Sequence, residues 1–538
     1  MKIFLLFISL YLVIFTLAWP ALPGEELKPY EGKIIRNIFI TRRNVFDDKI
    51  NHKTRFYYRW GNSLHFITRE NVIRRELLFS EGDSLKVAQV VESQRNLRLK
   101  AFIGDVEFKV IPAGNDSIDF DITTTDLWTT KAEAYLDLAG GNYTAAIGAT
   151  ESNLFGTGKM IQLSAENGSD QNGLFLLYYD PRLIGSHLAL NMSYSDYTYS
   201  KNFLYSLTRP QYSLEVPFGF KSLFSITRAR PRLFYHGEEY FIYRQNKTIV
   251  SLAGAYTLGK SKRLSFIPGY DYEKQDFSED KPDLPLNAYI PQDELMSYPS
   301  LGIRIATLKY GVEKYLDSAG NPEDMTYGAA LKYRFGQSLD AFGADFIGYF
   351  QYAIAQFLCK PRDWLYIGGL DEVTWWGHNG RSERIRHISR ASIYIKPAET
   401  HTLAIGGLTD FAWRQRNAYQ VYLGGGNGLR GYSFYEFAGS KLAVGNIEYR
   451  FYTPLEILTV KIGAAAFFDI GNVWRQSDDI HLKELKSDIG LGLRFGLIKS
   501  STSRVVNLDL ARALSDSGFY ITFSSLASFN LGFANIGE

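Results

Sequence analysis

One arginine has an unusual setting in the chain. Arg430 is separated by one residue from Leu423–Gly428 (LGGGNG), on a loop expected between two strands. Glycines allow such a loop to fold tightly against other backbone, because they carry no side chain. The planar guanidinium fork of an arginine suits two carboxylates at once. The pattern therefore indicates an arginine that a loop carries toward acidic partners.

Strand alternation suggests two such partners. In Leu442–Tyr452 the apolar side chains share one face and Glu448 lies on the other, and Asp469 is placed in the same way within Lys461–Trp474. If the apolar faces meet lipid, both carboxylates point into a barrel, and an inward loop pairs Arg430 with Asp469, with Glu448 close by. The alternative is that all three are ordinary charges in a water-filled interior, and the spacing alone does not decide.

Two glycine motifs that can bind phosphates receive structural interpretations. Gly426–Gly431 matches GxGxxG, but Leu442–Phe451 alternates as a strand where a dinucleotide site needs a helix. Gly158-Lys159 lacks the upstream glycine of a phosphate-binding loop, since Asn153 stands there. Both motifs are expected to be turns.

Composition excludes several classes of protein. The 8 histidines are scattered without metal-ligand spacing, and the single cysteine, Cys359, permits no internal disulfide framework. A net charge of +2 gives no reason to expect nucleic acid as a partner. We expect no enzymatic activity, no cofactor and no metal.

The chain divides into an export signal and two structural parts. Residues 1–21 read as a secretory signal peptide, and residues 32–126 predict a small α+β domain of order β-α-α-β-β. In that domain Thr68 is expected to cap a helix that runs to Leu78, and Ser84 to cap a second helix. The segment Thr41–Ile67 receives no assignment.

Residues 129–529 alternate in segments of about ten residues, the length that crosses a membrane as a tilted strand. Alternation over this length, with 36 Tyr, 37 Phe and 47 Gly, exceeds what a soluble sandwich carries and predicts an all-β transmembrane barrel. About twenty candidate segments are present, some of them candidates for hairpins above the membrane. Residues 530–538 form a tail.

At this point a resemblance becomes specific. Gly428, Leu429, Arg430, Gly431 and Tyr432 (GLRGY) resemble the lid-loop motif of the BamA/TamA-type outer-membrane assembly factors, also called the bacterial surface antigen family. The same family is resembled by NIEYRF (Asn446–Phe451), FFDIGNVW (Phe467–Trp474), NLFGTGK (Asn153–Lys159) and DPR (Asp180–Arg182). The N-terminal domain resembles a single POTRA (polypeptide-transport-associated) domain.

The resemblance implies a barrel of sixteen antiparallel strands in the outer membrane of a diderm bacterium, with the POTRA-like domain in the periplasm. It implies that the Arg430 loop folds into the lumen, pairs with Asp469 and lies near Glu448. It also implies a weak lateral seam between the first and last strands, where strands of unfolded outer-membrane protein clients enter by β-augmentation. The seam residues are Thr130, Ala132, Ala134 and Leu136 on the first strand, and Phe519, Ile521, Phe523 and Phe529 on the last.

Three functions stay open. The leading one is insertion or assembly of outer-membrane proteins, without ATP or cofactor, and the others are a polypeptide secretion pore and a passive structural barrel. Outer-membrane lipids are expected partners in each case, and periplasmic chaperones or accessory proteins are expected partners of the POTRA-like domain. Because Ala132 and Ala134 offer little side-chain packing, an assembly factor predicts fewer hydrogen bonds at the seam than between other neighbouring strands.

Overall fold

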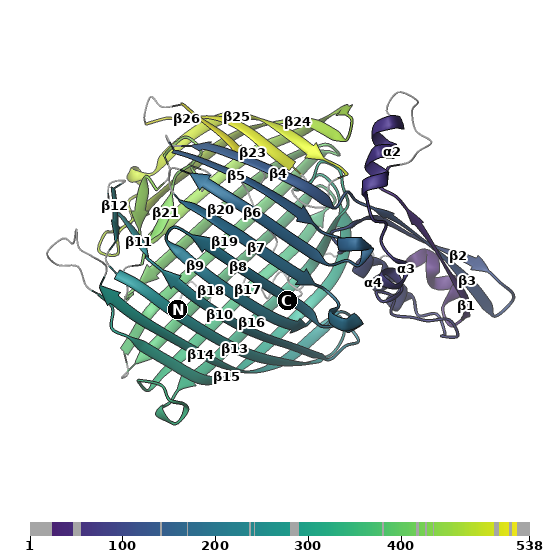
Figure 1. Cartoon of the computed structure of the whole chain (residues 1–538), viewed down its shortest axis with the longest axis horizontal. Helices are drawn as coiled ribbons and strands as arrows, with labels where there is room; N and C mark the ends of the chain where they lie inside the picture. The colour runs from purple at the N-terminus through teal and green to yellow at the C-terminus, as the bar shows by residue number, and fades with distance from the viewer. Residues whose placement is uncertain are drawn as a thin grey trace.

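A computed structural model of the chain shows an N-terminal α+β unit joined to a closed β-barrel (Figure 1). The structure describes residues 24–46, 55–139, 142–168, 171–235, 238–241, 243–279, 290–378, 381–415, 419–425, 428–433, 435–499, 505–515 and 519–524. The expected signal peptide (1–21), the tail (530–538) and Phe529 lie outside these residues. In the described part of the chain no helix is long and apolar enough to cross a membrane.

The N-terminal unit is a three-stranded sheet with helices packed on it. Its elements are the 3-10 turn η1 (Glu25–Tyr30), β1 (Ile34–Arg43), α2 (Arg55–Leu64), α3 (Glu70–Arg74), α4 (Val87–Arg98), β2 (Ile103–Pro112) and β3 (Ser117–Asp126). The strand order is β1-β3-β2, with β1 parallel and β2 antiparallel to β3. Ile35, Ile118, Phe120 and Ile122 form the buried core with Leu85. The observed order is β-α-α-α-β-β instead of the expected β-α-α-β-β, because α2 is an additional helix in the segment Thr41–Ile67 that received no assignment.

The two expected helix caps are wrong. Arg69 and not Thr68 precedes α3, which ends at Arg74, and the Thr68 hydroxyl donates instead to Asp126 at 2.9 Å. Lys86 precedes α4, and the hydroxyl of Ser84 donates to the carbonyl of Gly32. Both short polar side chains bond to groups far away in the sequence, which a local capping rule does not see.

The barrel is one closed antiparallel sheet of twenty strands within the described residues. In chain order they are β4 (Thr130–Ala139), β5 (Asn142–Glu151), β6 (Met160–Gly168), β7 (Asn172–Asp180), β8 (Ala189–Tyr197), β9 (Ser200–Arg209), β10 (Phe218–Ala229), β13 (Tyr243–Leu258), β14 (Lys262–Glu279), β15 (Glu294–Glu313), β16 (Glu323–Ser338), β17 (Gly348–Arg362), β18 (Leu365–His378), β19 (Arg381–Ala398), β20 (His401–Trp413), β23 (Lys441–Ile457), β24 (Val460–Trp474), β25 (Lys486–Leu497), β26 (Val505–Ala513) and β27 (Phe519–Ser524). Two further pairs of strands are not members of the ring: β11 (Arg232–Tyr235) with β12 (Glu238–Phe241), and β21 (Val421–Leu423) with β22 (Phe437–Gly439). Both belong to loops at the end of the barrel opposite the N-terminal unit (Figure 1). Short 3-10 turns complete the list: η2 (Leu154–Gly156), η3 (Leu183–Gly185), η4 (Asp340–Phe342) and η5 (Leu482–Glu484).

The number of strands departs from the resemblance. Sixteen strands were implied by the family, whereas the count of alternating segments in the sequence, about twenty, agrees with the ring. Alternation counts the strands that this chain carries, whereas the family number assumes that no hairpin has been added.

The two faces of the barrel differ as alternation predicts. On β15 the side chains of Leu301, Ile303 and Ile305 are exposed on the outer face, while Arg304 and Ala306 are buried on the inner one. An outer surface of exposed aliphatic and aromatic side chains needs an apolar solvent, which a lipid bilayer provides.

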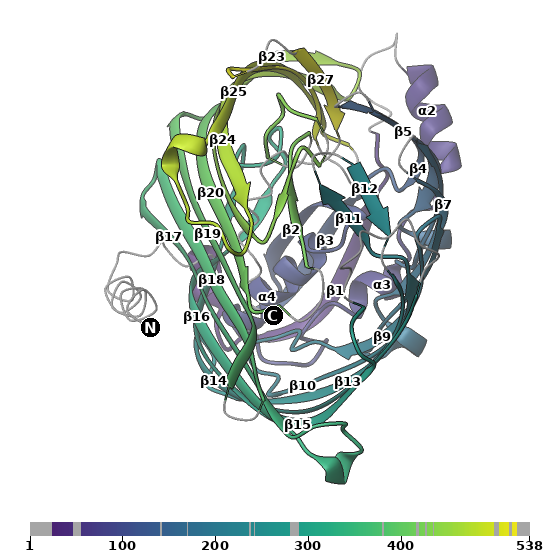
Figure 2. The same cartoon turned by 90° about the vertical axis from the view of Figure 1, so that its left-hand side faces the viewer.

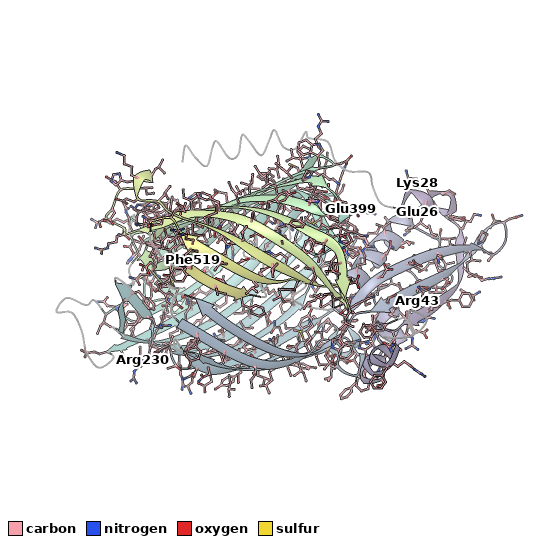
Figure 3. The ribbon with its side chains drawn as sticks, turned by 90° about the horizontal axis from the view of Figure 1, so that it is seen from above. Glu26, Lys28, Arg43, Arg230, Glu399 and Phe519 are labelled. Carbon is pink, nitrogen blue, oxygen red and sulfur yellow. The ribbon has the colours of Figure 1, made fainter. Side chains whose placement is uncertain are left out.

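The N-terminal unit contacts the turns at one end of the barrel. Glu76, beside α3, accepts from the Nε of Arg182 at 2.8 Å and pairs with Lys100 at 3.0 Å. Asn153, in the turn before β6, donates to the hydroxyl of Thr68 at 2.9 Å. Figure 2, which looks into the barrel from its other end, shows the N-terminal sheet behind the ring of strands. In Figure 3, Arg43 of this unit and Arg230, in the loop after β10, mark opposite ends of the molecule.

Candidate functional site

The loop that joins β20 to β23 carries the arginine singled out by the sequence. We call residues 414–440 the lid loop. Gly424, Gly425 and Gly428 have positive φ angles of 126°, 63° and 110°, which other residues rarely adopt, so the glycine-rich run allows the loop to turn back on itself. Leu429 and Tyr432 are buried in an apolar cluster with Leu442, Val473 and other side chains of the barrel wall.

Arg430 lies inside the barrel and is held by three carboxylates. Its Nε donates to Asp469 at 2.7 Å and its Nη2 to the other oxygen of the same carboxylate at 2.9 Å. Its Nη1 donates to Glu448 at 2.8 Å and to Asp509 at 3.1 Å. The guanidinium also stacks on Phe467, 3.3 Å from the ring centroid. The contact with Asp469 is the two-pronged one for which an arginine is suited.

Two further arginines complete the charge network. Arg450 donates to Glu448 at 2.8 Å, and Arg494 pairs with both Glu448, at 3.1 Å, and Asp509. Each of these six side chains is at most 6% exposed. Burying so many charges is costly unless each one is paired, so the network favours one arrangement of the loop against the wall.

Backbone groups of the motif fix the loop as well. The amide of Gly431 donates to Asp488 at 3.0 Å, and a Cβ at this glycine would lie 2.6 Å from the Cβ of Asp488. The Tyr432 hydroxyl donates to the carbonyl of Ser487 at 3.1 Å, and Asn446 donates to both Gly428 and Asp469. Every residue of GLRGY is therefore placed by packing, by hydrogen bonds or by a close backbone approach.

The loop that carries β11 and β12 packs against the lid loop. The backbone of Phe234, in β11, exchanges two hydrogen bonds with the side chain of Gln420, and the Tyr422 hydroxyl donates to the carbonyl of Arg232. Phe234 stacks on Tyr435 with ring centroids 4.4 Å apart. The lid loop is thus held between the barrel wall and the β11–β12 hairpin, which lies inside the outline of the ring in Figure 2.

The expected seam residues lie on neighbouring strands. The ring closes between β4 and β27. Phe519, Ile521 and Phe523 are exposed on the outer face of β27, and Figure 3 shows Phe519 on that strand. Thr130, Ala132, Ala134 and Leu136 lie along β4, and Phe529 is outside the described residues.

Sequence reasoning missed half of the charge network. Arg450, Arg494 and Asp509 were not predicted as members of the network. The signal for Asp509 was present in Val505–Ala513, where alternation puts Asn507 and Asp509 on one face. Which inward charges meet depends on strand register and on how the loop folds, and neither is visible in the sequence. Among the described residues no group of three or more His, Cys, Asp or Glu side chains is placed to hold a metal ion.

Part of the chain, including the lid loop, is similar in sequence to known proteins. A sequence profile described as the Omp85 superfamily domain matches residues 398–497, which contain the lid loop, Arg430, Glu448 and Asp469. Residues 398–497 therefore carry an Omp85 superfamily domain. Over 130 residues, 23% of the chain, it is 28% identical to the outer membrane protein assembly factor BamA of Neisseria meningitidis serogroup B, and the match spans 16% of that relative's length.

Two solved structures match most of the chain at low identity. BamA from Haemophilus ducreyi lacking POTRA domains 1–3 matches 91% of this chain and 84% of its own, at 14% identity and a TM-score of 0.41. CdiB from Escherichia coli matches 92% of this chain and 76% of its own, at 12% identity and a TM-score of 0.46.

Proposed function

We propose that this protein inserts or assembles other β-barrel proteins in the outer membrane, and that client strands are recruited where β4 meets β27. The observation that carries the proposal is the position of the Arg430 partners. Glu448, Asp469 and Asp509 lie on β23, β24 and β26, and Asp488, which accepts from Gly431, lies on β25. The lid loop is thus bonded to four consecutive strands that lead directly to β27. A shift of the loop changes the wall beside the β4–β27 junction.

The mechanism needs only strand addition. When β4 and β27 separate, each exposes unpaired backbone N–H and C=O groups that no water satisfies within the membrane. An unfolded client strand that pairs with such an edge gains those hydrogen bonds and is held while its next hairpin forms. The free energy comes from folding of the client, so no nucleotide or cofactor is required. Residues 32–126 would stand in the periplasm as a POTRA-like domain and receive clients or accessory proteins.

A secretion pore is the second candidate, and the size of the ring favours it. The diameter of a barrel grows with the number of strands, and a ring of twenty encloses a lumen wide enough for an aqueous channel. In that case the lid loop would leave the lumen and a polypeptide would pass through it.

Photocrosslinking in lipid vesicles separates the two functions. The probe is an unfolded eight-stranded outer-membrane barrel. A photoreactive residue is placed at Ala132 on β4, at Lys221 on the inner face of β10, or, as a control, at Ile303 on the outer face of β15. An assembly factor gives adducts at position 132, and client insertion is measured by its resistance to protease. Adducts at position 221 with none at 132 would reject assembly and favour secretion.

Arg430→Ala should reduce insertion of the probe, and Arg430→Lys should restore it in part, because an ammonium cannot make the two-pronged contact with Asp469. A further comparison sets the swap Arg430→Asp with Asp469→Arg against each single change. If both single variants insert the probe at the normal rate, the ion pair has no part in assembly.

A further inference from the structure

The loop between β15 and β16 folds against inner side chains of the barrel, at the end next to the N-terminal unit. We call residues 314–322 the inner turn. Leu316 and Ala319 are each 1% exposed, and Leu316 packs in a cluster with inner side chains of the barrel, among them Tyr327, Tyr366 and Tyr394. The Glu323 carboxylate accepts from the amides of Leu316, Asp317 and Ser318, so the turn has a fixed shape of its own.

The inner turn reaches strands that are not its neighbours in the ring. Asp317 accepts from Arg450 of β23 at 3.0 Å and from the Tyr394 hydroxyl of β19 at 3.0 Å. Arg450 also donates to the carbonyl of Leu316 at 2.9 Å. Asn321 donates to the carbonyl of Ile498, beyond the end of β25, at 2.9 Å. The turn therefore bridges the lumen to the wall that carries the partners of Arg430.

A chain of charges connects the inner turn to the lid loop. Asp317 is 31% exposed, whereas Arg450, Glu448 and Arg430 are buried. Asp317 pairs with Arg450 at 3.0 Å, and Arg450 pairs with Glu448 at 2.8 Å. Glu448 pairs in turn with Arg430 at 2.8 Å. Arg450 and Glu448 thus each have one partner on the side of the inner turn and one on the side of the lid loop. If Arg450 loses Asp317, its buried guanidinium must find another partner, and its movement shifts Glu448.

The two strands that flank the inner turn contact the N-terminal unit. Arg98, at the end of α4, pairs with Asp324 at 3.0 Å, next to the turn at the start of β16. The Arg95 guanidinium, also on α4, stacks over Tyr310 near the end of β15, 3.7 Å from the ring centroid. The N-terminal unit thus holds the hairpin that carries the inner turn.

We propose that Asp317 is a positioning residue that couples the lid loop to the N-terminal unit through Arg450 and Glu448. Movement of α4, for example when a client binds the N-terminal unit, displaces the β15–β16 hairpin and weakens the hold on Arg430. This inference rests on the proposed function for its purpose, since it gives the periplasmic side a means to release the lid loop. The coupling itself joins only the inner turn and the lid loop of this chain.

Hydrogen exchange of the full purified chain in detergent micelles tests the coupling. The readout is the exchange rate of the Gly431 amide, which is bonded to Asp488 in the closed lid loop. Coupling between sites commonly amounts to about 5- to 150-fold, so Asp317→Asn should speed this exchange by a factor in that range. The matched control is Glu313→Gln: Glu313 sits on the same hairpin and binds Lys360 and Tyr366, outside the chain of charges. It should leave the Gly431 rate unchanged.

Two further variants make the test decisive. In an Arg430→Ala background, where the chain is already cut, Asp317→Asn should add nothing at Gly431. Because coupling is reciprocal, Arg430→Lys should speed exchange of the Ser318 amide in the inner turn. This second measurement also serves if Asp317→Asn fails to fold, as judged by its heat-dependent gel migration.

Equal effects of Asp317→Asn and Glu313→Gln would mean general loosening of the hairpin and would overturn the proposal. So would a folded Asp317→Asn variant with an unchanged Gly431 rate, or an unchanged Ser318 rate in Arg430→Lys. Because the exchange experiment contains no client, coupling without client insertion would reject the proposed function alone, and insertion without coupling would reject this inference alone.

Discussion

Removal of the Arg430 guanidinium should release the lid loop by an amount that the structure allows us to calculate. In Arg430→Ala, Glu448 keeps Arg450 and Arg494, and Asp509 keeps Arg494. Asp469, which is fully buried, loses its bidentate cation and keeps Asn446 at 2.7 Å. The variant therefore leaves one uncompensated buried carboxylate, a change that costs about 3–5 kcal/mol.

The assay is local, because a large barrel does not unfold in a single step that would report on one loop. Hydrogen exchange at the Gly431 amide measures opening of the lid loop. A cost of about 3–5 kcal/mol corresponds to exchange that is faster by roughly 100- to 4,000-fold, since about 1.4 kcal/mol is tenfold. Asp469→Asn in the Arg430→Ala background removes the stranded charge and should recover most of the protection.

The result that refutes this reasoning is a change of less than about threefold in Arg430→Ala, a size typical of exposed ion pairs worth at most about 1 kcal/mol. It would mean that water reaches Asp469 as soon as Arg430 is gone. A large loss that Asp469→Asn does not recover would show that the guanidinium acts mainly through its stacking on Phe467.

Two further predictions concern Gly431 in the lid loop and Glu76 in the N-terminal unit. Gly431→Ala puts a Cβ 2.6 Å from the Cβ of Asp488 and 2.8 Å from the amide nitrogen of Ala513, so the motif must move away from β25 and β26. We expect faster hydrogen exchange of the backbone amides around Tyr432. Unchanged exchange would mean that the loop accommodates the methyl group without moving. The attachment of the N-terminal unit to the barrel should weaken in acid: burial raises the pKa of the Glu76 carboxyl, but Lys100 and Arg182 outweigh it, and the pKa lies below its ordinary value. A depressed carboxyl pKa stabilises the attached state above the ordinary value of about 4.3 and loses that contribution as pH falls through the lowered pKa. A fluorescence distance between labels on the unit and on the barrel should therefore be constant from neutral pH to about pH 5 and rise below about pH 4, whereas Glu76→Gln should show no such step.

The architecture could be predicted from the sequence because it depends on a local rule that each strand obeys independently. Alternation on β15 or β24 is set by lipid on one side and the lumen on the other, whatever the neighbours do. The same rule turned Asp469 and Glu448 inward. It could not show that Asp317 contacts Arg450. Asp317 is remote from Arg450 in the sequence and lies on a turn that resembles any other polar loop. The contact depends on which strands face each other across the ring. The capping predictions for Thr68 and Ser84 were wrong because both side chains bond to groups that are remote in the sequence.

The polar character of the lid site has a mechanical consequence. A lid loop held by apolar packing alone would be at least as stable, since replacing buried ion pairs by well-packed apolar residues is often neutral or stabilising. It would, however, tolerate small displacements, because apolar contacts are non-directional. Arg430 instead requires Asp469, Glu448 and Asp509 in one geometry, and these lie on three different strands of the wall beside β27. Spreading or sliding of that wall would break directional hydrogen bonds, so we expect the wall and the loop to switch between two arrangements and not to shift gradually. Under the proposed function, a change at the β4–β27 junction would release the loop, and release of the loop would open the junction.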